Sequence, residues 1–312
     1  MKKQRLLFIV GPTACSKSDL GVAVCEALSA PTPEIINCDS VQFFAGVEIG
    51  AAKPGPDLLA RAKHHLVGHV PLGEGYTAGD FTRDALEVLS EGQARGVERF
   101  VGVGGSGFYV QALEKGMYDV PEVPEEIREK LEERIASEGQ PALYEELKRL
   151  DPETASRIDP NDRYRILRSL EILHASPGTK LSEIKERFAA KERPFIAKKI
   201  GLFRPRDILR ERVGERTRKM LGSGLLEEVE SLRKQGLHEW WPMKSVGYKE
   251  AQDYLDSRIP SLAKLEELIV TSTMQLAKRQ MTWFKRDPAT EWFDVEQGLS
   301  RPLASAREFF DE

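Results

Sequence analysis

The chain has 312 residues, a length typical of about two domains and sufficient to bury a hydrophobic core without disulfide or metal staples. Hydrophobic residues make up 40% of the sequence and charged residues 31%, a composition that excludes a disordered protein. The formal net charge of -4 excludes a broadly basic, non-specific nucleic-acid binder, but it averages over the chain and leaves room for a local basic surface.

Cysteine use and hydropathy predict a reduced, cytoplasmic protein. Cys15, Cys25 and Cys38 are odd in number and lack C-x-x-C spacing, so neither a disulfide framework nor a zinc site is expected. No apolar run is long enough for a membrane span, and the short basic and apolar start leads into Gly11 rather than a signal-peptide cleavage site. We expect an enzyme that acts as a monomer and has no membrane partner.

The first 110 residues alternate between strand and helix patterns. Short continuous apolar runs indicate buried parallel strands, and the segments between them show the periodicity of amphipathic helices. This alternation predicts an α/β fold with a parallel sheet flanked by helices. The expected strands are 6–10, 34–38, about 65–70 and 99–103; the expected helices are 18–28, 77–95 and one that runs from the glycine-rich turn at 104–107 through Leu113.

Strand patterns then disappear between Glu125 and Ala190. Pro121 and Pro124 interrupt the chain, and Ile127, Leu131 and Ile135 follow at helical spacing. A strand pattern returns at 200–203, followed by long helices expected at 206–221, 225–235 and 262–284. We therefore predict a small all-α domain, residues 119–197, inserted into a core formed by residues 1–118 and 198–312.

A loop that resembles a phosphate loop joins the first strand to the first helix. Its amide groups and the helix N-terminus can converge on an anion, as in G-x-x-x-x-G-K-[ST]. Lys17 supplies a positive charge and Ser18 a hydroxyl for Mg²⁺, whereas Ser16 departs from the motif by replacing its second glycine. The loop predicts a fold like that of P-loop NTPases and a bound phosphate chain, held by Gly11, Pro12, Thr13, Ala14, Cys15, Ser16, Lys17 and Ser18.

Asp39 directly follows the second predicted strand. Ligands of open parallel sheets bind at the carboxyl ends of the strands, so this carboxylate is expected near the phosphate loop. A helix N-cap or a metal ligand would also explain an aspartate here, and on these residues alone a small-metabolite kinase fits as well as any other enzyme.

A series of short segments, in order along nearly the whole chain, resembles the tRNA dimethylallyltransferases, also called tRNA isopentenyltransferases. No single segment is decisive, but the ordered set is highly specific. The segments are Gly11-Pro12-Thr13-Ala14, Ile36-Asn37-Cys38-Asp39-Ser40-Val41-Gln42, Gly50-Ala51-Ala52-Lys53-Pro54, His64-His65-Leu66, Tyr76-Thr77-Ala78, Gly104-Gly105-Ser106-Gly107-Phe108-Tyr109, Asp151-Pro152, Pro160-Asn161-Asp162, Gly247-Tyr248-Lys249-Glu250 and Ala277-Lys278-Arg279-Gln280-Met281-Thr282-Trp283-Phe284.

The resemblance implies that a dimethylallyl group moves from dimethylallyl diphosphate to N6 of the adenosine immediately 3′ of the tRNA anticodon, with release of diphosphate. Asp39 would be the general base, while Thr13 and Lys17, with Mg²⁺, would hold the diphosphate. The target base must leave the stack of the anticodon loop to react. Residues implied to face the RNA here are Asp39, Ser40, Val41, Gln42 and Ser106.

The sequence departs from the usual family pattern at five positions. Ser16 replaces the loop glycine, and we expect it to weaken the donor site. Ala51 stands where threonine is frequent, Phe44 where tyrosine is, and Ser106 where threonine is usual, although Ser106 keeps the hydroxyl. Tyr164 replaces a glutamine in the stretch that contacts tRNA, which puts that contact in doubt.

Basic residues mark where tRNA would bind. Residues 198–219 contain nine basic and three acidic residues, a local net charge of +6 that favours contacts with RNA phosphates over an ordinary solvated helix face. The resemblance implies that an arginine of this helix, Arg212 or Arg216, instead reaches the diphosphate, and we favour Arg212. A second basic group includes Lys278 and Arg279, and in the insertion the resemblance implies tRNA contacts by Arg128, Tyr164, Arg165 and Arg168.

Two motifs suggest other chemistry but have simpler explanations. Residues 102–107 satisfy G-x-G-x-x-G, yet no strand ending in an acid follows at the spacing of a dinucleotide site. His64, His65 and His69 form a cluster, but adjacent side chains point apart and no cysteine is nearby, so structural or surface histidines are favoured over a metal site. Two other functions remain open, a small-metabolite kinase and a non-catalytic tRNA-binding protein.

Overall fold

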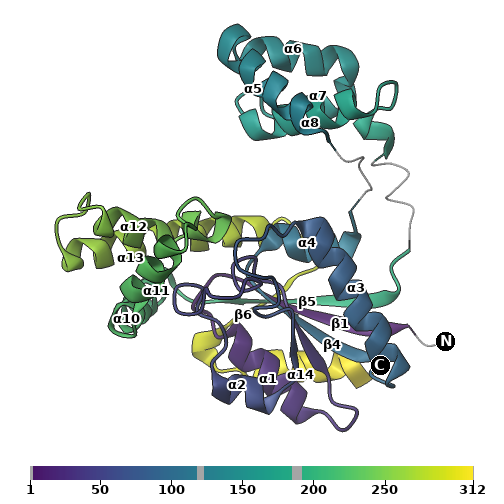
Figure 1. Cartoon of the computed structure of the whole chain (residues 1–312). Helices are drawn as coiled ribbons and strands as arrows, with labels where there is room; N and C mark the ends of the chain where they lie inside the picture. Colours follow the sequence, from purple (N-terminus) through teal and green to yellow (C-terminus); the bar gives the residue numbers. More distant parts are fainter. Residues whose placement is uncertain (1–2, 118–122, 185–191, 312) are drawn as a thin grey trace. The chain divides into compact units, whose positions relative to one another are not determined.

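The structure, a computed structural model, describes residues 3–117, 123–184 and 192–311 (Figure 1). The chain divides into two compact units: a core unit (Met1–Glu114 and Pro194–Glu312) and a helical unit (Lys115–Arg193). Both boundaries fall four residues before the predicted ones at 119 and 198. The predicted second boundary is wrong because residues 195–197, assigned to the insertion, belong to a strand of the core sheet. None of the described helices is long and apolar enough to cross a bilayer.

The described part of the core unit contains a six-stranded sheet in the order β3-β2-β4-β1-β5-β6. All five strand pairings found there are parallel, which confirms the predicted sheet type. β1 is central because its residues are almost all buried on both faces, as its continuous apolar sequence requires. The strands are β1 Gln4–Val10, β2 Glu34–Asn37, β3 His64–His65, β4 Arg99–Val103, β5 Phe195–Phe203 and β6 Glu291–Asp294.

Alternate residues of β1 build two hydrophobic cores, one on each face of the sheet. Leu6 and Phe8 pack against α3 and α4, whereas Leu7 and Ile9 pack against α1 and α14. Figure 1 shows these two pairs of helices on opposite faces of the sheet. The helices around the sheet are α1 Lys17–Ala27, α2 Pro56–Arg61, α3 Ala78–Ala94, α4 Gly107–Lys115 and α14 Ser300–Asp311.

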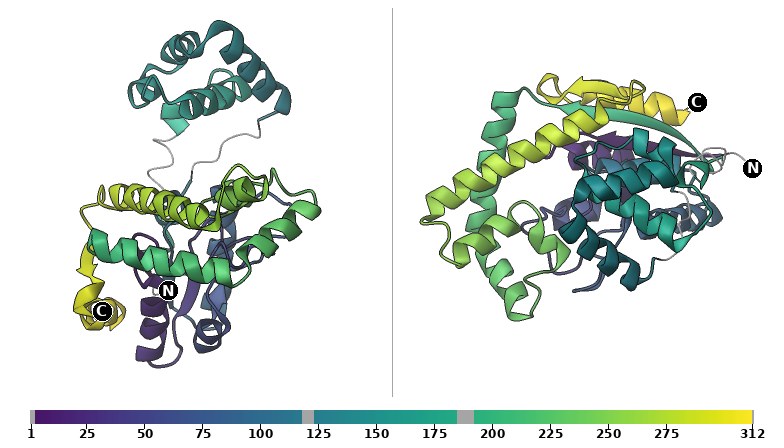
Figure 2. Two further views of the ribbon diagram at one scale, coloured as in Figure 1. Left: turned by 90° about the vertical axis from the view of Figure 1, so that its left-hand side faces the viewer. Right: turned by 90° about the horizontal axis from the view of Figure 1, so that it is seen from above.

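Four further helices extend the core unit beyond one edge of the sheet. α10 and α13 pack side by side, and α12 packs against both α11 and α13 (Figure 2). α13 has the predicted bounds because Ser261 accepts a hydrogen bond from the Lys264 amide and so caps its first turn. These helices are α10 Arg206–Gly222, α11 Leu225–Lys234, α12 Tyr248–Leu255 and α13 Leu262–Phe284.

The third predicted strand is shorter than expected. β3 contains only His64 and His65, and the chain turns away at Leu66, whose φ of 61° is left-handed. Val70, the expected end of the strand, forms only an isolated bridge with Phe44. An apolar stretch therefore does not extend the sheet here, because the backbone leaves the ladder after two residues.

The helical unit has a separate hydrophobic core. Leu131 and Ile135 are buried and Ile127 is partly buried there, so the predicted helical face is correct. Asp151 and Asp162 begin α7 and α8 by accepting hydrogen bonds from the amides of Thr154 and Arg165, respectively. Both acids are therefore helix N-caps, which explains why an aspartate stands at each of these positions. The helices are α5 Glu125–Glu138, α6 Gln140–Leu150, α7 Pro152–Ser156 and α8 Arg163–Ala175.

Candidate active site

The phosphate loop, residues 11–18, lies at the carboxyl end of β1 and leads into α1. Gly11, Ala14 and Ser16 all have positive φ angles, 135°, 61° and 53°. Residues that alternate between right- and left-handed backbone turn successive N–H groups toward one side and create a concave site for an anion. Ser16 thus adopts the left-handed conformation that favours the motif's glycine.

Arg204, just beyond β5, supports the phosphate loop at Ser16, where the sequence departs from the motif. Its Nε donates to the carbonyl oxygen of Ala14 at 3.2 Å, and its Nη2 donates to Oγ of Ser16 at 3.2 Å. Its side chain is only 9% exposed and forms an ion pair with Glu296. A glycine at position 16 would offer no hydroxyl to Arg204, so this contact depends on the serine.

Lys17 and Arg216 bring positive charge to the loop. Nζ of Lys17 donates to the carbonyl oxygen of Pro12 at 2.6 Å, and Nη1 of Arg216 donates to Oγ1 of Thr13 at 2.9 Å. Burial lowers the pKa of both cations, and the carboxylate of Asp39 opposes that shift. Desolvated cations interact strongly with an anion, so this pair suits a diphosphate.

Arg212 and Arg216 are one helical turn apart on α10 but differ in their contacts. Arg212 is 56% exposed and lies 3.8 Å from a carboxylate oxygen of Glu215, whereas Arg216 is partly buried and contacts the loop directly. Both line the cavity described below. The structure therefore favours Arg216 over Arg212, the arginine preferred from sequence.

Asp39 follows β2 and faces the same cavity as the phosphate loop. Its amide donates to Oδ1 of Asn37 at 3.1 Å, and its own Oδ1 accepts from the Val41 amide at 3.1 Å. Within the described part of the chain, Oδ2 of Asp39 accepts no hydrogen bond. One carboxylate oxygen is thus fixed by the backbone while the other is available for a substrate proton.

The cavity that joins these groups has a volume of about 450 Å³. Its wall is cationic around the phosphate loop and α10, and apolar where Leu58, Val67 and Val103 line it. A charged end and an apolar surface in one cavity suit a ligand that carries both phosphate and hydrocarbon. The polar residues that line it include Thr13, Ser16, Lys17, Ser18, Asp19, Asn37, Asp39, Gln42, Arg204, Arg212, Arg216 and Lys219.

Gln280 of α13 joins the phosphate loop to the glycine-rich turn at 104–107. The amide of Thr13 donates to Oε1 of Gln280 at 3.0 Å, and Nε2 of Gln280 donates to the carbonyl oxygen of Gly105 at 3.0 Å. Gln280 belongs to a segment that carries the family resemblance, but no local pattern marks it as a site residue.

The glycine-rich turn is a packing element. A Cβ at Gly104 would lie 2.2 Å from the carbonyl oxygen of Cys38, so only glycine allows the two backbones to approach this closely. The turn thus holds the strand end that carries Asp39. The other two glycines of the turn are also closely packed: a Cβ at Gly105 would meet Gln280, and one at Gly107 would meet Trp283.

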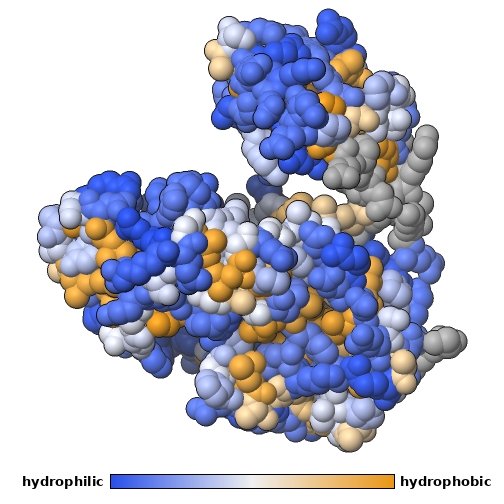
Figure 3. Space-filling view, in the orientation of Figure 1, coloured by the Kyte–Doolittle hydropathy of each residue, from blue (hydrophilic) through white to orange (hydrophobic). Residues whose placement is uncertain are grey.

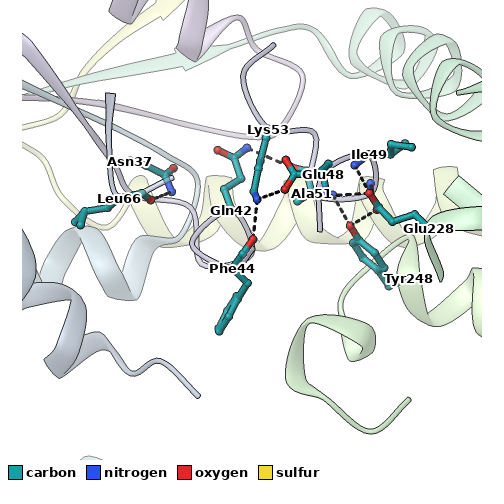
Figure 4. A network of polar contacts seen from close by, with 11 residues as sticks. Asn37, Gln42, Phe44, Glu48, Ile49, Ala51, Lys53, Leu66, Glu228 and Tyr248 are labelled. Carbon is teal, nitrogen blue, oxygen red and sulfur yellow. Dashed lines mark hydrogen bonds and ion pairs between the residues drawn. The ribbon is translucent and has the colours of Figure 1, made fainter. Parts of the chain in front are cut away.

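The segment from Ser40 to Gln42 is held from two sides. Oγ of Ser106 accepts from the Ser40 amide at 2.9 Å and donates to Oγ of Ser40 at 3.0 Å. The side chain of Gln42 lines the cavity, and its Nε2 donates to the carbonyl oxygens of Ala51 and Ala52 at 3.2 and 3.1 Å (Figure 4). Val41 is half-buried and packs against the core. Ser106, expected to face RNA, is therefore also a structural partner of Ser40.

The basic stretch 198–219 does not form one surface. Lys199 is buried and pairs with Glu114 and Asp287, and Arg204 supports the phosphate loop. Only part of the local charge of +6 is therefore available to RNA phosphates, because spacing along a sequence does not report which side chains a strand and a helix bury. On α13, Lys278 and Arg279 are exposed.

In the helical unit, the predicted RNA contacts lie on a face rich in ion pairs. Arg128 and Arg168 both approach Glu171, at 3.8 and 2.7 Å, and Arg165 pairs with Asp162. Tyr164 is 77% exposed. Figure 3 shows the helical unit with a mostly hydrophilic visible surface. These contacts with RNA stay predictions.

Each histidine of the cluster has a contact within the core unit, and His64 also lines the cavity. Nε2 of His65 lies 2.7 Å from Oε2 of Glu34, and Nδ1 of His64 lies 2.8 Å from the carbonyl oxygen of Ala62. His69 packs edge-on against Phe43 and Tyr76. Among the residues that the structure describes, no group of three or more His, Cys, Asp or Glu side chains is arranged to hold a metal ion.

The parallel sheet, the phosphate loop after β1 and the carboxylate after β2, with β4 between these two strands, define a protein of the P-loop NTPase-like class. Comparisons with known proteins are more specific. Residues 42–287 match the family described as IPP transferase. The tRNA dimethylallyltransferase of Bdellovibrio bacteriovorus is 42% identical over 312 residues, 99% of both chains, and that of Geobacter sulfurreducens is 39% identical over 309 residues, 99% of this chain and 97% of the relative. The chain therefore belongs to the IPP transferase family, whose curated relatives are tRNA dimethylallyltransferases.

Solved structures agree with this assignment. The tRNA isopentenylpyrophosphate transferase from Bacillus halodurans has a TM-score of 0.70 and 30% sequence identity, with 99% of this chain and 96% of that chain covered. A eukaryotic dimethylallyltransferase acting on tRNA has a TM-score of 0.81 at 24% identity, covering 99% of this chain and 80% of that one, and shares the fold.

Proposed function

We propose that this protein transfers a dimethylallyl group from dimethylallyl diphosphate to N6 of the adenosine immediately 3′ of the anticodon in tRNA and releases diphosphate. The observation that carries the proposal is the position of Asp39 in the same cavity as Lys17 and Arg216. In one displacement reaction, the carboxylate then acts as the base for the attacking amine, and the anion-binding loop holds the leaving diphosphate. The names of the curated relatives support the choice of donor and acceptor.

At the donor end, the phosphate loop amides, Lys17 and Arg216 bind the diphosphate. Negative charge grows on the leaving oxygen as the bond to C1 of the dimethylallyl group breaks, and these fixed donors stabilise that charge. Thr13 is held between Arg216 and Gln280: its amide donates to Gln280, whereas its hydroxyl accepts from Arg216 and can still donate to the diphosphate. Arg216 takes the role that sequence reasoning gave to Arg212.

At the acceptor end, N6 of adenine attacks C1 as the diphosphate leaves. An exocyclic amine is a poor nucleophile and acquires positive charge as the C–N bond forms, so a positioned carboxylate that accepts one N6 proton lowers the barrier. Asp39 is that carboxylate in our proposal. The adenine reaches the cavity only when it leaves the anticodon-loop stack, and Gln42 lines that cavity.

The residues present fit Mg²⁺ bound together with the diphosphate. Ser18, Asp19 and Asp39 supply oxygen atoms at the cavity, while the described residues offer no ready-made protein cage. Mg²⁺ is characteristically held by few protein oxygens together with substrate phosphates, and Ser18 is its proposed protein ligand. When bound, the ion would neutralise charge on the diphosphate.

The tRNA contacts are proposed on both units. The exposed Arg165 and the partly exposed Arg168 of α8, together with Arg128, suit the phosphates of the anticodon stem-loop, and Lys278 and Arg279 offer further charge on α13. Ser106, which hydrogen-bonds to Ser40, remains a proposed contact of the RNA. We propose the monomer as the active form, because every group assigned a catalytic role lies in one core unit.

Mass spectrometry of tRNA tests the proposed function. The protein is incubated with dimethylallyl diphosphate, Mg²⁺ and unmodified tRNA, and the nucleosides are searched for prenylated adenosine. We expect one prenyl group per reactive tRNA and no phosphate transfer when ATP replaces the donor. Phosphoryl transfer from ATP without prenylated tRNA would instead establish a kinase, and tRNA binding without turnover would establish a non-catalytic protein.

A further inference from the structure

Residues 48–53 form a turn beside the cavity, called the 48–53 turn below. The carboxylate of Glu228, on α11, holds this turn. Oε2 of Glu228 accepts from the amides of Glu48 and Ile49, both at 2.9 Å. Oε1 accepts from the amide of Gly50 at 3.1 Å and from the hydroxyl of Tyr248 at 2.6 Å. Three successive backbone amides and one hydroxyl thus converge on Glu228, which lies 178 to 180 residues from those three amides in sequence (Figure 4). Charge-assisted hydrogen bonds of this kind are the strong ones.

Tyr248 joins the 48–53 turn to Glu228 of α11. The proposed mechanism assigns no role to either contact. A Cβ at Gly50 would lie 2.4 Å from Cε2 of Tyr248, so the ring packs directly on the turn. The amide of Ala51 donates to the Tyr248 hydroxyl at 3.2 Å. Tyr248 is fully buried, and burial together with the adjacent Glu228 raises the pKa of its phenol. The hydroxyl therefore stays protonated and donates to the carboxylate.

The same turn fixes the side chain of Gln42. Nε2 of Gln42 donates to the carbonyl oxygens of Ala51 and Ala52, and only the amino end of an amide can satisfy two carbonyls. Oε1 must therefore point away from the turn, as Figure 4 shows. Lys53 closes the other end of the turn by donating to the Phe44 carbonyl at 2.7 Å. Oε1 is thus the end of the Gln42 amide that is left for a ligand, and Gln42, like Asp39, lines the cavity.

We infer that Glu228, assisted by Tyr248, is a positioning residue that sets the orientation of the Gln42 amide and thereby the acceptor that meets the exocyclic amine of the tRNA base. The chain of contacts runs from Glu228 through the amides of residues 48–50 to the carbonyls of Ala51 and Ala52, and from there to Gln42. This inference rests on the proposed function, because it assigns Gln42 to the base-binding end of the cavity. Glu228 itself does not line the cavity.

The test separates the two substrates kinetically. Glu228→Gln replaces one acceptor oxygen with an amino group that faces backbone donors, and it should lower kcat/KM for tRNA about 10- to 100-fold, the effect of losing a charged hydrogen-bond partner. The KM for dimethylallyl diphosphate should stay within about twofold, because the phosphate loop is untouched. Glu230→Gln, an exposed carboxylate on the same helix paired with Lys234, is the matched control and should behave as wild type.

A double variant tests whether Glu228 acts through Gln42. If it does, Glu228→Gln should have little further effect on kcat/KM for tRNA in a Gln42→Ala background. Additive losses, or equal losses with both substrates, would overturn the inference. If Glu228→Gln does not fold, Tyr248→Phe removes one hydroxyl only and should shift the same parameter by about three- to tenfold; an unchanged kcat/KM would then refute the inference. Absence of transfer by the wild type would instead refute the proposed function.

Discussion

The core unit and the helical unit both carry many cations but hold them in different surroundings. In the core unit, Lys17 and Arg216 are desolvated beside the phosphate loop, with Asp39 in the same cavity. In the helical unit, Arg165 and Arg168 lie at the surface and pair with neighbouring carboxylates. The cations of the core unit are therefore fixed in position, whereas the arginines of the helical unit can change partners and are screened by solvent.

This difference predicts two kinds of functional contribution. A buried cation cannot be replaced by solvent, so removing it should affect one step of the reaction strongly. An exposed ion pair contributes about 0.2–1 kcal/mol to stability, and its arginine can exchange a carboxylate for an RNA phosphate at little cost. Salt should therefore weaken what the helical unit binds far more than what the core unit binds.

The largest effect is expected at the carboxylate of the core unit. Asp39→Ala should lower the rate of prenyl transfer at least ~100-fold, the lower end for loss of a general base, while dimethylallyl diphosphate still binds. Single-turnover transfer to tRNA and donor titration measure the two properties. Asp57→Ala, an exposed acid in the first turn of α2, serves as the control. Near-normal transfer by Asp39→Ala would remove the assigned base.

The two arginines of α10 should differ clearly. Arg216→Ala should lower kcat/KM for dimethylallyl diphosphate roughly 10- to 100-fold, since it removes a charged hydrogen-bond donor next to Thr13. Arg212→Ala should lower it by less than about fivefold, because that side chain is exposed and screened. Steady-state kinetics with varied donor measure both. The reverse order would restore the preference for Arg212.

In the helical unit, the double variant Arg165→Ala and Arg168→Ala should weaken tRNA binding about tenfold at low salt. Loss of two phosphate contacts should also flatten the plot of log affinity against log salt by about 1.5. The donor KM should not change. Titration of labelled anticodon stem-loop at several salt concentrations gives the slope; an unaltered slope would place the RNA elsewhere.

The smallest effect is expected at Ser16. The sequence predicts that this serine weakens the donor site, but it already adopts the backbone conformation of the glycine and gains a contact with Arg204. A left-handed non-glycine residue costs about 1–2 kcal/mol and the lost hydrogen bond about 1, so the two terms nearly cancel in Ser16→Gly. We expect its donor KM to stay within about threefold of wild type. A tenfold fall in KM would support the sequence-based prediction.

Local patterns were sufficient for much of the fold and for the donor loop. The apolar run of β1 and the capped periodicity of α13 are properties of neighbouring residues, and both elements appear at or near their expected bounds. β6 was not predicted, because a four-residue strand with one buried side chain has no clear periodicity. The short β3 shows the opposite failure, in which an apolar run did not continue as a strand.

Within the candidate site, the sequence by itself placed the phosphate loop, Lys17 and Asp39, because each follows a recognisable strand end. Only the tertiary structure showed that Gln280 binds the amide of Thr13, 267 residues away, and that Arg216 rather than Arg212 reaches the loop. It also brought Glu228 to the 48–53 turn. Hydrophobic periodicity and turn residues act over a few positions, whereas these polar contacts depend on how α10, α11 and α13 pack against the sheet edge, which no local pattern contains.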